Sequence, residues 1–94
     1  MAAKIEVEKT GNLEFLVRII EKGGESTHAV TLNQADYARL AGGMMEPEEL
    51  VRRSFEFLLE REPKESILSR FDLSVISRYF PEFESEIKRK VPKS

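Results

Sequence analysis

His28 is the only histidine of the chain, and there is no cysteine. A catalytic or metal-binding histidine needs a set of partner side chains, and the spacing of the sequence suggests no Cys-His or Ser-His-Asp arrangement. His28 stands close to Val30 in a segment of alternating residues, on the side expected to face the core, where a hydrogen-bonded structural histidine is typical. The absence of cysteine also excludes disulfides and thiolate metal sites. We therefore expect no catalytic, metal-binding or cofactor-binding residues.

Carboxylates are the remaining groups that could do chemistry. Glu48-Glu49 and Glu60 with Glu62 fall in predicted helices with basic neighbours and lack the pattern of a calcium loop. Solvated helix faces account for them, although a carboxylate-only activity is left open.

Two glycine pairs invite comparison with phosphate-binding loops. Neither Gly23-Gly24 nor Gly42-Gly43 is followed by the Lys-Ser/Thr of a P-loop or by the third glycine of a dinucleotide fingerprint. A hairpin turn for the first pair and a helix C-terminus for the second are the expected uses.

Basic side chains offer a possible anion site. The hexamer 66–71 recurs eight residues later as 74–79, with Arg70 and Arg78 in equivalent places, each before an aromatic residue. The repeat predicts either a paired anion or peptide contact or one packing solution used twice by two short helices.

Positive charge is concentrated near the C-terminus. Residues 43–87 carry six basic and eleven acidic side chains, whereas residues 88–94 carry four basic and none acidic: Lys88, Arg89, Lys90 and Lys93. These residues could contact nucleic acid or an acidic partner, and they would also complement the negative end of a helix. By contrast, Arg52-Arg53 has glutamates at a spacing of four and is expected to be neutralised within its helix.

The N-terminal third predicts a three-stranded antiparallel meander over residues 4–32. Its residues alternate with period two, and Gly23-Gly24 suits a two-residue type I′ turn that pairs Val17 with Val30. A three-residue loop at 10–12 pairs Val17 with Ile5. Both turns place the same apolar side chains on one face, which we expect to be the core face.

The opposite face of this meander is partly apolar. It carries Leu16, Ile20 and Ala29 among charged residues. Scattered surface aliphatics or cover from a C-terminal helix would explain them, and so would a patch for a dimer or a protein partner.

Residues 33–91 predict helices. Asn33 is a suitable N-cap and Gly42-Gly43 a suitable stop for a short first helix, and Pro47 opens the longest helix, which runs to about Arg61. The apolar residues of the long helix span an arc of roughly 200°, which indicates burial on two sides. Pro63, Asp72 and Pro81 divide the remainder into about three short helices.

These elements make one α+β domain over residues 1–94: a three-stranded antiparallel meander (4–32) packed against a long helix, several short helices in a helical region (33–91), and a tail (92–94). The apolar runs are too short for a membrane span and the chain opens without a secretory signal, so we expect a cytoplasmic protein without membrane association.

The segment Glu48–Pro63, continuing to 78–83, resembles a family of short bacterial proteins of uncharacterised function. The resemblance covers about the C-terminal half, and it implies no catalytic residue and no ligand. The segment 47–54 is also loosely similar to the second helix of ribbon-helix-helix repressors, which need a basic strand paired across a dimer. The strands of this chain are mixed in charge.

Together these features predict a non-enzymatic protein-interaction or regulatory module, acting as a homodimer or with a protein partner. The alternative is a nucleic-acid-binding regulator that uses the basic tail and nearby arginines.

Overall fold

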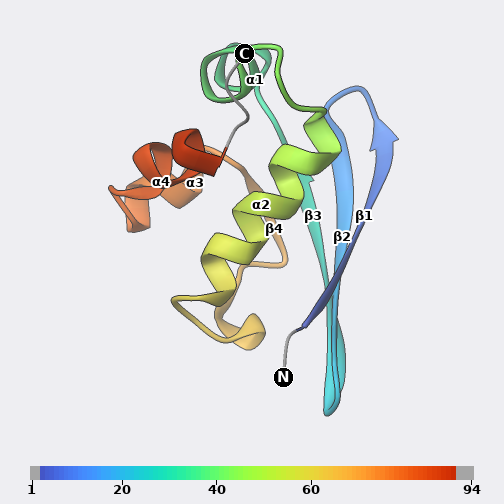
Figure 1. The fold of residues 1–94 in the computed structure, drawn as a ribbon. Coiled ribbons are helices and arrows are strands. Elements are labelled where there is room, and N and C mark those ends of the chain that lie inside the picture. The colour runs from blue at the N-terminus through green and yellow to red at the C-terminus, as the bar shows by residue number, and fades with distance from the viewer. Residues whose placement is uncertain (1–2, 91–94) are drawn as a thin grey trace.

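The N-terminal third forms the antiparallel strands that its period-two pattern predicts (Figure 1). The computed structural model describes residues 3–90 and contains β1 (Lys4–Gly11), β2 (Glu14–Glu21) and β3 (Gly24–Thr31). On β2, the alternate residues Phe15, Val17 and Ile19 are at most 2% exposed. The predicted core face is therefore confirmed.

The pairing of the strands differs from the prediction by two residues in both hairpins. Val17 lies opposite Val7 on β1 and opposite His28 on β3. A shift of two residues leaves every side chain on its predicted face, because successive side chains of a strand alternate. The apolar pattern therefore predicts which face of a strand is buried, but it cannot distinguish two registers that differ by two residues.

Charge explains the observed register between β1 and β2. It places Glu6 opposite Arg18, with Arg18 Nη1 3.2 Å from Glu6 Oε1. The predicted register would have placed Glu8 opposite Glu14, and like charges directly across a strand pair are destabilising.

The turn between β2 and β3 is formed by Lys22 and Gly23, since Glu21 pairs with Gly24. Only Gly24 of the glycine pair has a positive φ, 150°. A type I′ turn at the glycine pair would need positive φ at both residues, so that prediction is wrong.

Two helices follow the strands at the predicted places. Helix α1 (Gln34–Ala41) begins after Asn33, whose side chain accepts from Ala35 N at 2.7 Å, and it ends at Gly42 with φ 57°. Helix α2 (Pro47–Leu59) begins at its proline. Both helix starts and the glycine stop are confirmed.

The C-terminal segment contains a strand that the sequence pattern did not predict. After the short 3₁₀ helix η1 (Lys64–Ser66), β4 (Arg70–Asp72) pairs in parallel with β3, and α3 (Val75–Tyr79) and α4 (Phe83–Lys90) follow. The sheet therefore has four strands in the order β1-β2-β3-β4 instead of three. The two similar hexamers adopt different structures: the first leads from the end of η1 into β4, and the second forms α3.

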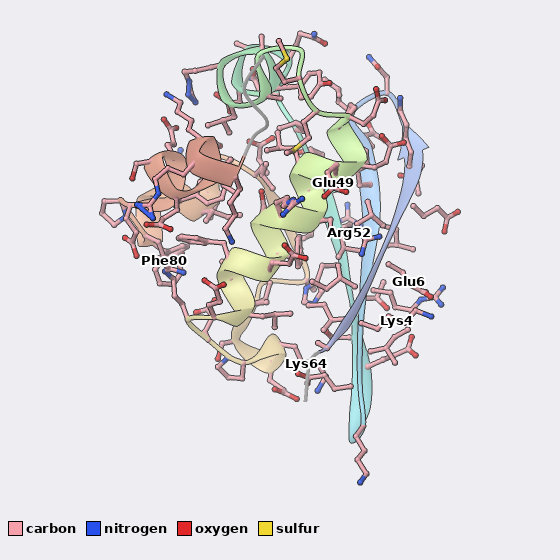
Figure 2. All side chains as sticks on the ribbon, viewed as in Figure 1. Lys4, Glu6, Glu49, Arg52, Lys64 and Phe80 are labelled. Atoms are coloured by element: carbon pink, nitrogen blue, oxygen red, sulfur yellow. The ribbon has the colours of Figure 1, made fainter. Side chains whose placement is uncertain are left out.

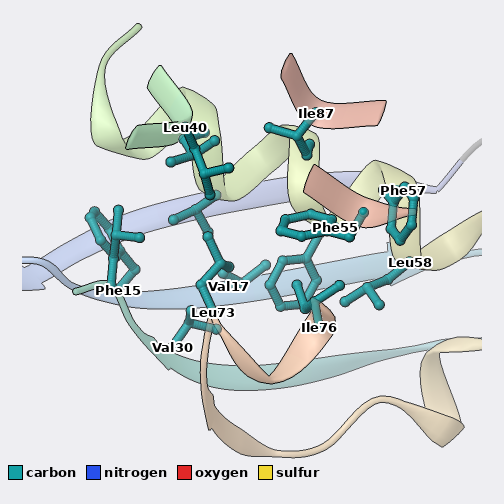
Figure 3. Close-up of a cluster of buried hydrophobic side chains, with 14 of the residues drawn as sticks. Phe15, Val17, Val30, Leu40, Phe55, Phe57, Leu58, Leu73, Ile76 and Ile87 are labelled. Atoms are coloured by element: carbon teal, nitrogen blue, oxygen red, sulfur yellow. The ribbon is translucent and has the colours of Figure 1, made fainter. Parts of the chain in front are cut away.

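Helix α2 lies across one face of the sheet, with the C-terminal helices beyond it (Figure 1). Its residues Phe55 and Phe57 are at most 1% exposed, and Phe55 packs its ring 5.6 Å from His28 and 5.8 Å from Phe71. The rings of Phe80 and Phe83 contact Phe57 from the other side. Figure 3 shows this single core around α2, so the predicted two-sided burial is confirmed.

Truncation of Phe55 tests the central position of α2. We expect Phe55→Ala to lower the free energy of unfolding by about 3–5 kcal/mol, because it leaves a cavity between sheet and helix. Phe80→Ala is the control at a half-buried ring and should cost clearly less. Urea unfolding followed by circular dichroism measures both, and equal losses would contradict the central position of Phe55 in the core.

Candidate functional site

The three apolar residues predicted on the outer sheet face are half-buried there. Leu16 lies beside Ala29, but Arg18 separates Leu16 from Ile20 along β2. Arg18 is held over this face by ion pairs of 3.2 Å to Glu6 and 3.6 Å to Glu25. No described helix covers the face (Figure 1). The residues therefore form two small apolar spots divided by charge, and their role in partner binding stays a prediction.

The two repeated arginines lie on different elements. Arg70 belongs to β4, where it pairs with Ala29 and lies on the same outer sheet face. Arg78 is on α3. Both are exposed. The equivalence that the repeat predicted is wrong, because one copy is extended and the other helical, and an anion contact by either arginine stays a prediction.

The basic residues near the C-terminus occupy the last turn of α4, where they complement its negative end. Arg89 pairs with Glu86 at 3.6 Å and Lys90 with Glu60 at 3.9 Å, while Lys88 is exposed. Lys93 lies outside the described residues. Part of the predicted positive charge is thus balanced locally, and nucleic-acid contact stays a prediction.

An apolar groove of about 400 Å³ lies between the C-terminal end of α2, the segment from η1 to β4, and α3. We call it the α3 groove. Its lining residues are Leu58, Glu62, Ser66, Ile67, Leu68, Phe71, Val75, Ile76, Tyr79 and Phe80. Leu68 is 48% exposed and Tyr79 68%, and together with Met44 they are the large hydrophobic side chains most open to water among residues 3–90. A hollow lined in this way is suited to hold apolar side chains.

Sequence reasoning missed this groove because it treated residues 66–71 as a helix. In an extended segment neighbouring side chains point in opposite directions, so Ile67 and Leu68 cannot both reach the core. Ile67 is 7% exposed and takes the inward position. The adjacent aliphatic residues Ile67 and Leu68 could have indicated an exposed apolar side chain, but only if the segment had been predicted to be extended.

His28 holds one wall of the α3 groove in place. Its Nδ1 lies 2.7 Å from Leu68 O, a carbonyl oxygen that can only accept, and Ser26 Oγ lies 2.8 Å from Nε2. The ring is 2% exposed and packs on Phe55. Both ring nitrogens therefore have hydrogen-bond partners, and the prediction of a hydrogen-bonded histidine on the core face is confirmed.

The segment before Leu68 is anchored to the sheet by Lys64. Its ammonium group lies 2.6 Å from Glu65 and 3.1 Å from Glu21 at the end of β2. The hydrogen bond to Glu65 and then the one to Glu21 raise the pKa of Lys64. Figure 2 shows Lys64 at the end of the molecule where η1 turns back.

Asp72 ties the other end of β4 to its neighbours. Its carboxylate accepts from Thr31 Oγ1 at 2.7 Å, Ser74 Oγ at 2.7 Å and Ser74 N at 3.1 Å. Burial by itself would raise the pKa of Asp72, but these hydrogen bonds outweigh it and hold the pKa below the ordinary value of 3.8. The ionised side chain thus fixes β4 against β3 and the start of α3.

Apolar side chains make up most of the lining of the α3 groove. Across residues 3–90, no three side chains of the histidine, aspartate and glutamate types come close enough to hold a metal ion. None of the helices in that same range has the length and apolar character that a membrane span requires.

Comparisons of the chain with protein families, with curated proteins and with solved structures found no match. The resemblance of the C-terminal half to short bacterial proteins stays a prediction.

Replacement of His28 tests its role in the groove wall. We expect His28→Leu to lower the free energy of unfolding by about 1–3 kcal/mol, because Leu68 O and Ser26 Oγ lose their partner. Ser26→Ala removes only one of the two contacts and should cost less. Chemical denaturation of the three proteins measures this, and an unchanged His28→Leu protein would contradict the assignment.

Asp72 should contribute to the acid sensitivity of the protein. Because its pKa is lower in the folded than in the unfolded chain, its stabilisation is complete above about pH 4 and is lost as the pH falls through the folded pKa. We expect Asp72→Asn to be less stable than the parent at pH 7, by about 1 kcal/mol. The difference should shrink towards pH 2.5 in denaturation series, and a difference independent of pH would contradict the prediction.

Proposed function

We propose that this chain is a non-enzymatic protein-interaction module that holds an apolar segment of a partner protein in the α3 groove. The observation that supports this most directly is the exposure of Leu68 and Tyr79 at the rim of an apolar hollow. Exposing large apolar side chains to water is unfavourable, and a partner that covers them recovers the hydrophobic free energy.

The composition and support of the groove favour this function. Tyrosine and other large side chains in a hollow are frequent sources of binding energy, because they bury much area at low conformational cost. The walls are held by His28 and by Lys64, so a partner would meet a largely preformed surface. A preformed surface loses less entropy on binding than a mobile one.

The alternative functions have less support. The outer sheet face around Leu16 and Ile20 is interrupted by the Arg18 ion pairs, so it offers less continuous apolar surface to a second copy or partner. Nucleic-acid binding stays a prediction, recognisable by an affinity that falls steeply with salt.

A double variant tests the proposed function. Leu68→Ser with Tyr79→Ser should retain the thermal stability of the parent within a few degrees, since the two side chains are 48% and 68% exposed. It should lose proteins that the parent captures from an extract of its source organism, as identified by mass spectrometry.

Met44→Ser is the matched control, because Met44 is 48% exposed, like Leu68, but lies in the loop between α1 and α2. It should retain the captured proteins. A double variant that captures the same proteins as the parent and as Met44→Ser would refute the groove as the binding surface.

A further inference from the structure

The α3 groove lies beside a free sheet edge. Within residues 3–90, β4 is the last strand of the sheet and pairs with β3 alone. Ala29 N donates to Ser69 O at 2.8 Å and Leu73 N to Thr31 O at 2.9 Å. In a parallel ladder this pattern turns the odd-numbered residues of β4 towards β3 and directs the backbone N–H and C=O groups of Arg70 and Asp72 away from it. Those groups are available to a further strand.

The side chains of β4 make the two faces of this edge different, one apolar and one charged. Phe71 points to the inner face, where it lines the groove together with Leu68 and Val75. Arg70 points to the outer face beside Ala29, is exposed, and forms no ion pair with any residue in 3–90. An apolar hollow and an unpaired positive charge therefore lie on opposite faces of one edge.

The other edge of the sheet has a side chain bound to one of its carbonyl groups. Arg52 on α2 donates from Nη1 to Ile5 O at 2.5 Å, and this carbonyl lies on the outer edge of β1. Figure 2 shows Arg52 between α2 and β1. A side chain that occupies an edge carbonyl competes with an added strand at that position, so the two edges of the sheet differ at this point.

We propose that the edge of β4 and the α3 groove bind an extended peptide segment of a partner protein as a fifth strand. Its backbone pairs with Arg70 and Asp72, an apolar side chain enters the groove, and an acidic side chain on the opposite face pairs with Arg70. This inference rests on the proposed function and specifies the partner. Strand addition takes affinity from main-chain hydrogen bonds and specificity from pockets for alternate side chains, which is the combination that β4 presents.

The sequence pattern of the bound segment follows from strand geometry. Side chains on opposite faces of a strand are separated by one or three positions. The segment should therefore carry Asp or Glu one or three residues from a large apolar residue, and it should lack proline within the paired stretch.

A displayed library of random decapeptides, panned on the whole chain, provides the probe. We expect the enriched peptides to show this pattern. A synthetic enriched peptide should slow hydrogen exchange of the Arg70 and Asp72 amides, measured by NMR, because these N–H groups would gain acceptors. Protection at the β1 edge, or the absence of enriched peptides, would overturn the proposal.

Charge reversal separates strand addition from other uses of the groove. Arg70→Glu should weaken the acidic peptide about tenfold, while Lys88→Glu, the same charge change at an exposed position of α4, should leave the affinity unchanged. Thermal melting of both variants checks that they are folded.

The outcomes distinguish this inference from the proposed function. If Leu68→Ser with Tyr79→Ser abolishes peptide binding but Arg70→Glu does not, and the Arg70 and Asp72 amides stay unprotected, strand addition is wrong and the groove holds another conformation, such as a helix. If the groove variant also binds like the parent, both proposals fail.

Discussion

Burial of α2 on two sides is the constraint on which the rest of the structure depends. The sheet can bury only one face of the helix, so the chain after Leu59 must return and cover the other, where Phe57 meets Phe80 and Phe83. A helix with so wide an apolar arc would be unstable against the sheet alone. The return segment thus completes the core, and its path along the sheet edge creates β4 and the α3 groove together (Figure 1).

The groove remains open because the return segment is short and mostly extended. Between η1 and α3 the chain has to cross the edge of the sheet, which places Ile67, Phe71 and Leu73 in the core and leaves Leu68 outside. Polar contacts hold this path: His28 binds the Leu68 carbonyl, Lys64 binds Glu21, and Asp72 accepts from Thr31. Each contact joins the return segment to the meander, so the groove is anchored by the sheet that it borders.

The accuracy of the sequence prediction followed the range of the interactions. Helix caps depend on neighbouring residues, and Asn33, Gly42 and Pro47 end or begin helices as predicted. The hairpin register depends on pairs across strands, such as Glu6 with Arg18, and was wrong by two residues although every face was right. The hexamers 66–71 and 74–79 show the limit of local prediction, since nearly the same residue pattern leads into a strand in one place and forms a helix in the other.

The sequence by itself determined the α+β class, the core face of the meander and the central helix, because periodicity of apolar residues reports which side of an element is buried. It also indicated the structural role of His28 and the absence of cysteine chemistry. Only the tertiary structure decided the fourth strand, the free β4 edge and the groove with Leu68 and Tyr79 at its rim. The physical reason is that β4 has three residues, too few to show a period, and is held extended by backbone hydrogen bonds to β3, about 40 residues earlier in the chain.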